Sequence, residues 1–134
     1  MDIVCLGLSH HTAPLEVRER LALGEPARLA LLRTLTVGLP APSDLANDDP
    51  TPDHPPAPDL AREAVVLSTC NRTEVYATGP EREPLVRAIH HALAAAASLA
   101  ADELAPHLYV RSNADAVRHL LGVAAGLDSM ILGE

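Results

Sequence analysis

Residues 64–78, AVVLSTCNRTEVYAT, decide the fold of this 134-residue chain. Two short apolar runs, residues 64–69 and 74–78, have the length and the β-branched content of strands. Only residues 70–73 separate the two runs, and so short a connection predicts that the strands form an antiparallel hairpin. The other elements are predicted on either side of this hairpin.

On the N-terminal side of the hairpin, residues 3–8 form an apolar run that predicts a buried strand. Residues 9–14 are expected to form a polar turn. Residues 15–39 are predicted to be mainly helical, because leucines recur there at spacings of three and four. The sequence Gly24-Glu25-Pro26 is expected to break this region into two pieces.

On the C-terminal side, residues 83–100 predict a helix with a proline in its first turn and one apolar face. Residues 107–111 predict a short fourth strand. The sequence Ser112-Asn113-Ala114-Asp115 has the form of a capping box and is expected to open a last helix. The apolar face of that helix consists of Val117, Leu120, Leu121 and Ala124.

The predicted order is therefore β-α-β-β-α-β with an extra C-terminal helix, which is the ferredoxin-like arrangement of the α+β class. The hairpin and two crossovers place the four strands in one antiparallel sheet, with helices on one face. Residues 1–134 are expected to form a single domain. The fold alone predicts no activity, because one fold can carry many functions.

Residues 40–60 interrupt this pattern. Seven of the twelve prolines lie in residues 40–58, and five aspartates lie in residues 40–60. Such a segment buries almost nothing, so it is predicted to be a disordered surface loop. Either it is a tolerated insertion or it binds a partner. Without its five charges, the formal net charge of −8 falls to −3 for the remainder, which is near balance.

Composition excludes several classes of protein. No basic stripe is present, so composition alone does not suggest RNA binding. The chain has no apolar stretch of membrane-spanning length, and two cysteines make no disulfide framework. No signal peptide is expected, because Met1-Asp2 lacks a basic start before the apolar run. These features predict a cytoplasmic protein with reduced thiols and no membrane partner. Lysine is absent, which excludes a lysine Schiff base, and no G-x-G-x-x-G or phosphate-binding loop occurs.

Cys70 is the first candidate for chemistry, because it follows an apolar strand and lies in a short loop. It is either a nucleophile, reacting as thiolate, or a small buried hydrophobic residue. Arg72 could lower the pKa of this thiol, or it could bind a substrate carboxylate with its planar fork. Glu74 alternates with Arg72 and could be its ion-pair partner. Cys5 lies between apolar residues in a strand and is predicted to be a core residue.

His119 is the second candidate. It lies on the last predicted helix near the apolar face, where it is either a packed residue or an acid–base group suited to neutral pH. The other histidines include two adjacent pairs, 10–11 and 90–91, and they lack the spacing of metal ligands. No metal site is predicted.

Three segments together resemble the N-terminal domain of glutamyl-tRNA reductase, an enzyme that makes glutamate-1-semialdehyde for tetrapyrrole (5-aminolevulinate) biosynthesis. They are residues 7–14, GLSHHTAP, with Arg18-Glu19-Arg20; residues 67–76, LSTCNRTEVY; and residues 119–134, HLLGVAAGLDSMILGE. Their order and separation fit the family, and the match covers nearly the whole chain. The departure is the long loop at residues 40–60, which lies away from these segments.

The resemblance implies a role for each matching residue. Cys70 matches the nucleophile that attacks glutamyl-tRNA and forms a thioester, which hydride from NADPH then reduces to the aldehyde. His119 matches a histidine near the reacting centre. The remaining positions are substrate-binding Thr69, Arg72 and Ser129, and supporting Glu74 and Glu134.

The resemblance also implies parts that this chain lacks. In the family, the NADPH-binding and dimerisation domains follow the present C-terminus, and the apolar end of the chain predicts that something follows. The isolated domain is thus expected to lack the reductase step. Implied partners are glutamyl-tRNA, a second copy in a full-length homodimer, and the downstream aminomutase. The rival interpretation is a non-enzymatic ferredoxin-like module that binds a small ligand or a protein.

Overall fold

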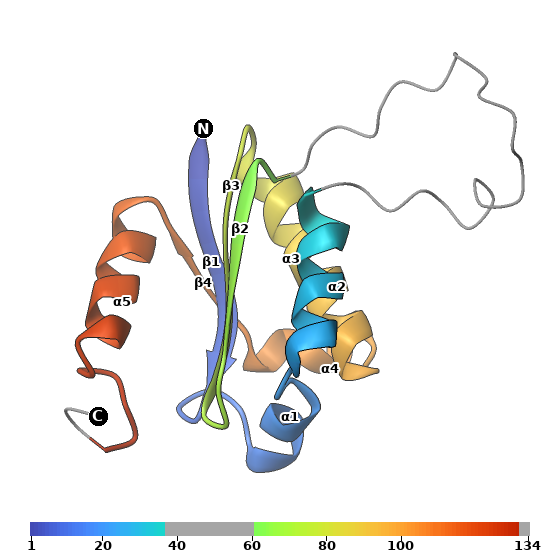
Figure 1. The fold of residues 1–134 in the computed structure, drawn as a ribbon, viewed down its shortest axis with the longest axis vertical. Helices are drawn as coiled ribbons and strands as arrows, with labels where there is room; N and C mark the ends of the chain where they lie inside the picture. Colours follow the sequence, from blue (N-terminus) through green and yellow to red (C-terminus); the bar gives the residue numbers. More distant parts are fainter. Residues whose placement is uncertain (37–60, 132–134) are drawn as a thin grey trace, which may run out of the picture.

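The computed structural model describes residues 1–36 and 61–131, drawn as a ribbon in Figure 1. The predicted loop at residues 40–60 lies outside the described residues. The elements in chain order are β1 Asp2–Ser9, α1 Leu15–Arg20, α2 Glu25–Thr36, β2 Glu63–Ser68, β3 Arg72–Gly79, α3 Arg82–Ala97, α4 Ala101–Leu104, a 3-10 turn Ala105–His107, β4 Tyr109–Ser112 and α5 Ala114–Ala124. None of the helices in these two ranges is long and apolar enough to span a membrane.

The four strands form one antiparallel sheet in the order β2-β3-β1-β4. In the pairing of β1 with β3, Leu6 lies opposite Val75 and Ser9 lies opposite Arg72. The hairpin between β2 and β3 and the two crossovers occur where the sequence predicts them. The predicted fold class, a ferredoxin-like α+β domain with an extra C-terminal helix, is confirmed.

Strand β3 begins at Arg72, two residues earlier than predicted, so the hairpin loop is shorter than expected. The cause is pairing with β1, since Arg72 and Thr73 lie opposite Ser9 and Leu8. The Thr69 amide donates to the Arg72 carbonyl oxygen at 2.7 Å and closes the loop. This closure leaves three residues, 69–71, at the tip of the hairpin.

The alternation of side chains along the strands builds two layers of packing. Val4, Leu6 and Leu8 of β1 face one side of the sheet and form the main core with buried leucines of α2 and α3. Cys5 faces the other side, where it packs with Tyr76 and Ala116 in a second, smaller cluster. Figure 1 shows α1 to α4 together on the first side and α5 alone on the second. The prediction that the helices share one face is therefore wrong for α5.

The start of α5 also differs from the prediction. Asn113 is the N-cap residue, with φ of 50°, and no side chain caps the helix. The Asn113 side chain instead accepts a hydrogen bond from the Ile3 amide at 3.0 Å and donates to Asp2 at 3.1 Å. Ser112 pairs with Val4 as part of β4. The predicted capping box is wrong, because these residues join the helix to the edge of the sheet.

The apolar face predicted for α5 is largely exposed. Val117, Leu120 and Leu121 are 43%, 40% and 64% exposed, and the buried residue of this helix is Ala116.

Helix α3 ends earlier than predicted, at Ala97, because Ser98 adopts a left-handed conformation with φ of 53°. The short helix α4 was not predicted, since four residues are too few to show a helical period.

Candidate active site

Three segments that are distant in sequence form a pocket of about 140 Å³ at one end of the sheet. They are the turn after β1, the tip of the β2–β3 hairpin and the segment after α5. The pocket is lined by His10, Thr69, Asn71, Arg72, Asp128, Ser129 and Met130. The structure thus brings together the three predicted substrate-binding residues, Thr69, Arg72 and Ser129.

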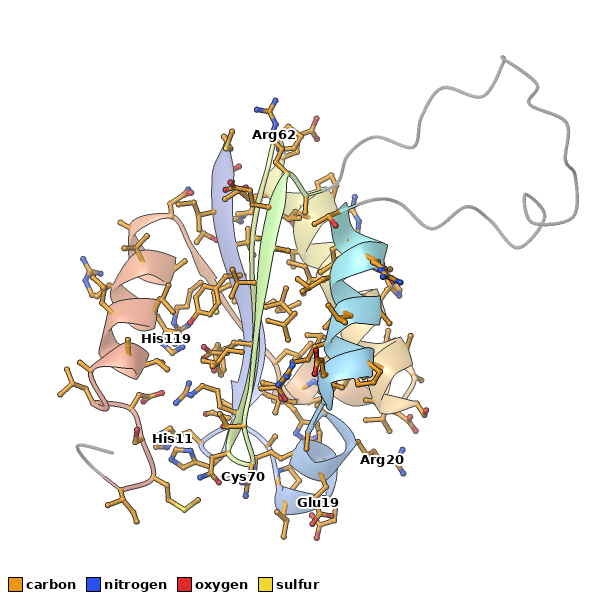
Figure 2. The ribbon with its side chains drawn as sticks, viewed as in Figure 1. His11, Glu19, Arg20, Arg62, Cys70 and His119 are labelled. Carbon is orange, nitrogen blue, oxygen red and sulfur yellow. The ribbon has the colours of Figure 1, made fainter. Side chains whose placement is uncertain are left out.

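Cys70 is exposed at the tip of the hairpin (Figure 2). Its neighbours in sequence, Thr69 and Asn71, both line the pocket. Helix α1 fixes the loop, because the Arg18 guanidinium donates to the Cys70 carbonyl oxygen at 3.3 Å and to Asn71 Oδ1 at 3.0 Å. Cys5 is fully buried, and burial, aided by the charge of Glu74, raises the pKa of its thiol to about 12. Of the two thiols, Cys70 is the one that solvent and a ligand can reach.

Arg72 is buried, and its guanidinium holds two carboxylates. Nη1 donates to Glu74 Oε1 at 2.7 Å and to the Tyr109 hydroxyl at 3.1 Å. Nη2 donates to Asp128 Oδ2 at 2.5 Å and to the Asp128 carbonyl oxygen at 2.8 Å. Burial by itself lowers the pKa of Arg72, but the hydrogen bonds to Glu74 and Asp128 raise it above its ordinary value. The predicted ion pair between Arg72 and Glu74 is confirmed.

Glu74 has no exposed surface, and its carboxylate is the centre of the polar network. Oε1 accepts hydrogen bonds from Arg72, from His119 Nε2 at 2.6 Å and from the Tyr109 hydroxyl. Oε2 accepts one from the Tyr76 hydroxyl at 2.6 Å. Burial opposes ionisation of Glu74, but these donors outweigh it and lower the pKa of the carboxyl. Glu74 is therefore a buried, ionised group with a full set of partners.

His119 binds Glu74 in this network. Its side chain is 17% exposed and packs edge-on against the Tyr109 ring at 5.4 Å between centroids. Figure 2 shows His119 on α5 well away from the hairpin tip that carries Cys70. The two predicted catalytic residues are thus not in contact. Predicted Glu134 lies outside the described residues.

Glycine at position 7 makes room for Glu74. Gly7 lies opposite Glu74 in the pairing of β1 with β3. A Cβ atom at Gly7 would lie 2.4 Å from the Thr73 carbonyl oxygen and 2.8 Å from Glu74 Cα and Cγ. A side chain there would clash with backbone atoms that the sheet holds in place. Gly7 is therefore part of the site as well as of the sheet.

Several residues of the site were missed from the sequence. Asp128, His10, Tyr76 and Tyr109 were assigned no role. A signal existed for Tyr76, because Arg72, Glu74 and Tyr76 alternate along β3 and must share a face of the sheet. No local pattern pointed to Asp128, which lies 56 residues from Arg72 in sequence.

Cys5, Glu74 and His119 place ligand atoms within 4.8 Å of one another, which is the spacing of a metal site. Two observations argue against a cation there. Glu74 already accepts hydrogen bonds from four side chains, and the permanent charge of Arg72 lies 2.7 Å from its Oε1 atom. The three residues fit a hydrogen-bonded network better than a metal centre.

Comparison with known proteins agrees with the resemblance seen in the sequence. A family model described as Glutamyl-tRNAGlu reductase, N-terminal domain, matches residues 6–134. Proteins named glutamyl-tRNA reductase are 42% identical in Synechococcus sp. (strain JA-3-3Ab) and 39% identical in Thermobifida fusca (strain YX). Both alignments cover this whole chain, but 26% and 24% of the relative.

A solved structure supports the fold. The chain is similar to a glutamyl-tRNA reductase from Methanopyrus kandleri, with a TM-score of 0.57 and 24% sequence identity. The similarity covers 98% of this chain and 24% of that protein. The chain thus spans about a quarter of the length of the proteins it matches. Since the family model matches nearly every residue, the chain belongs to the family of glutamyl-tRNA reductase N-terminal domains.

Proposed function

We propose that this chain is the catalytic domain of a glutamyl-tRNA reductase and that Cys70 is its nucleophile. One observation carries the proposal: the thiol of Cys70 is exposed at a hairpin tip whose neighbours, Thr69 and Asn71, line a pocket with Arg72. Rigid strands hold the tip, and such presentation is typical of catalytic residues on short loops. Membership of the family supports the choice of glutamyl-tRNA as the substrate.

The proposed step exchanges an ester for a thioester. The Cys70 sulfur forms a bond to the glutamyl carbonyl carbon, and the bond from that carbon to the terminal ribose oxygen of the tRNA breaks. The proton lost by the thiol ends on the released ribose hydroxyl. A thioester has weaker carbonyl resonance than an ester and a better leaving group, so this covalent step prepares a carbonyl that is easier to reduce.

Arg72 is the proposed anchor for the side-chain carboxylate of the glutamyl group. Its buried guanidinium offers a planar, charged fork, which matches a carboxylate. Thr69 and Ser129 line the same pocket. An amino acid without a carboxylate in its side chain would leave this pairing unmade, and such losses discriminate strongly between substrates.

Glu74 and His119 have supporting places in the proposal. The buried carboxylate of Glu74 fixes Nη1 of Arg72, and His119 and the two tyrosines fix Glu74. His119 Nε2 donates to the Glu74 carboxylate in this geometry, so His119 acts first as a positioning residue. A role as acid or base at the substrate would use the other ring nitrogen, Nδ1, because Nε2 is bound to Glu74. Glu134 is proposed as a further supporting residue on the strength of the resemblance alone.

The reductase of this family uses NADPH, according to the resemblance. The 134 residues contain no G-x-G-x-x-G loop. No reduction step is therefore assigned to the residues of this chain. A homodimer, contact with an aminomutase and a cytoplasmic location are proposals for the whole enzyme that rest on the resemblance.

The test is release of glutamate from glutamyl-tRNA by this chain, by Cys70→Ser and by Cys5→Ala as a matched control. The parent and Cys5→Ala are expected to deacylate the tRNA through a thioester that water hydrolyses. Cys70→Ser is expected to remain at the background rate. Mass spectrometry of acid-quenched samples should find the glutamyl adduct on Cys70. Equal rates for the parent and Cys70→Ser, with no adduct, would overturn the proposal.

A further inference from the structure

We propose that Asp128 binds the α-ammonium group of the substrate, and that it leaves Arg72 when the substrate carboxylate arrives. This inference rests on the proposed function, since it names a specificity-determining residue of the same pocket. In this proposal the Arg72–Asp128 ion pair exists only in the empty pocket, and the carboxylate of the glutamyl group replaces Asp128 at Arg72. The known partners of Arg72 show which of its contacts can be exchanged.

The two carboxylates that bind Arg72 differ in freedom. Glu74 has no exposed surface and accepts hydrogen bonds from four side chains, so it cannot turn away without breaking the whole network. The Asp128 side chain is 38% exposed and lies beyond the last helix, after residues 114–124. Nη1 of Arg72 is thus held permanently, whereas Nη2 is held by the exchangeable Asp128 carboxylate and by the Asp128 carbonyl oxygen.

The charges of the pocket match those of a glutamyl ester. Such an ester carries one carboxylate and one ammonium group. Among the described residues that line the pocket, Arg72 alone carries a permanent positive charge and Asp128 alone carries a carboxylate. When the ligand carboxylate replaces Asp128 at Nη2, the freed Asp128 carboxylate has the ligand ammonium as its nearest new cation. One ion pair becomes two, and no buried charge is left without a partner.

The other groups that face Asp128 leave it free for this exchange. His11 Nε2 lies 3.5 Å from Asp128 Oδ1, but the His11 side chain is 59% exposed and can move away. His119 is among the groups that lower the pKa of Asp128, but its ring is bound to Glu74 and not to Asp128. The pKa of Asp128 is raised by burial but is lowered overall by its hydrogen bonds to Arg72, so the carboxylate is ionised at neutral pH. An ionised carboxylate is the form that binds an ammonium group.

The experiment measures protection of Cys70 against iodoacetamide, with peptide mass spectrometry to separate it from Cys5. The two probes are isoglutamine, which has a γ-carboxylate, an α-amide and an α-ammonium, and glutaramic acid, which lacks only the ammonium. An amide resists attack by the thiol, so both probes act as ligands. In the parent chain, isoglutamine is expected to protect at a concentration about ten- to a hundredfold lower than glutaramic acid.

In Asp128→Asn the two probes are expected to protect Cys70 at about the same concentration, while protection by glutaramic acid is kept. That retained protection also shows that the pocket of the variant is folded. Asp128→Glu keeps the carboxylate and should recover part of the preference. Asp115→Asn, which alters an exposed aspartate paired with Arg118 on α5, is the matched control and should behave as the parent.

Each other outcome overturns the inference. Equal protection by the two probes in the parent would mean that the pocket has no ammonium site, and it would not contradict the proposed function. An unchanged preference in Asp128→Asn would place the ammonium on another group. Loss of protection by both probes in Asp128→Asn would mean that Asp128 only holds Arg72 in place. No protection of the parent by either probe would count against glutamate recognition itself, and so against the proposed function as well.

Discussion

The carboxylate of Glu74 lies at 0% exposure beside a guanidinium, an imidazole and two phenols. Burying a charge is costly, and removing one member of a buried ion pair leaves the other without compensation. Glu74 is thus the residue on which both the stability of the site and the placement of Arg72 depend.

Glu74→Gln keeps the shape of the side chain and removes its charge. Arg72 would then be paired on one side only, and the expected loss in the free energy of unfolding is about 3–5 kcal/mol. The matched control is Glu83→Gln, because Glu83 pairs with Arg82 on the surface, where both side chains are more than half exposed. That change should cost about 0–1 kcal/mol. Urea unfolding of the two variants measures both values, and similar losses would contradict the buried ion pair.

The pH dependence of stability should also report Glu74. Its pKa in the folded chain is lower than the ordinary value of 4.5, so the fold favours the ionised form. The resulting stability is fully present above about pH 4.5 and is lost as the pH falls through the lowered folded pKa. The free energy of unfolding, measured from pH 7 to pH 3, should fall less steeply below pH 4.5 in Glu74→Gln than in the parent. Parallel curves would mean that Glu74 does not titrate with folding.

At the scale of elements, Gly7 couples strand pairing to the site. Gly7→Ala places a methyl group against backbone atoms of Thr73 and Glu74, so β1 and β3 must separate locally. Overpacking of this kind costs about 1–3 kcal/mol, and here the obstacle is backbone. Gly122→Ala on α5 is the control, since a Cβ there meets nothing within 4 Å.

The control should be neutral or stabilising by up to about 1 kcal/mol, because alanine favours a helix more than glycine does. Chemical unfolding of both variants gives the comparison. If Gly7→Ala were as stable as Gly122→Ala, the close approach of β1 and β3 would not be a real constraint.

The helices and strands were largely predictable, because the spacing of apolar residues and the residues that end an element are local features of the sequence. The apolar runs before and after Cys70 defined β2 and β3, and alternation along β3 predicted that Arg72 and Glu74 share a face. The side of the sheet that α5 covers was not predictable in this way. It depends on Asn113, whose bonds to Ile3 and Asp2 span more than a hundred residues. Asp128 was missed for the same reason, since its contact with Arg72 joins residues 56 positions apart in sequence.

At the scale of the whole molecule, the pocket forms only where three separate segments of the chain meet. Its walls come from the turn after β1, the hairpin tip and the segment after α5, so no single element contains it. The central strands β1 and β3 join the first two segments, and Arg72 joins the third through Asp128. A change that detaches α5 from the sheet should therefore open the pocket without altering the hairpin that presents Cys70.

The residues that form this pocket determine which steps of the reaction this chain can perform alone. The chain contains the proposed nucleophile, Cys70, and the proposed carboxylate anchor, Arg72, and its sequence has no G-x-G-x-x-G loop. Incubation with glutamyl-tRNA should release glutamate, and added NADPH should change neither the rate nor the product. Chromatography of the products separates glutamate from glutamate-1-semialdehyde, and the longer glutamyl-tRNA reductase of Thermobifida fusca, assayed alongside, provides the reference for a hydride-dependent product. Semialdehyde formed by this chain with NADPH would mean that its 134 residues bind the cofactor without a G-x-G-x-x-G loop.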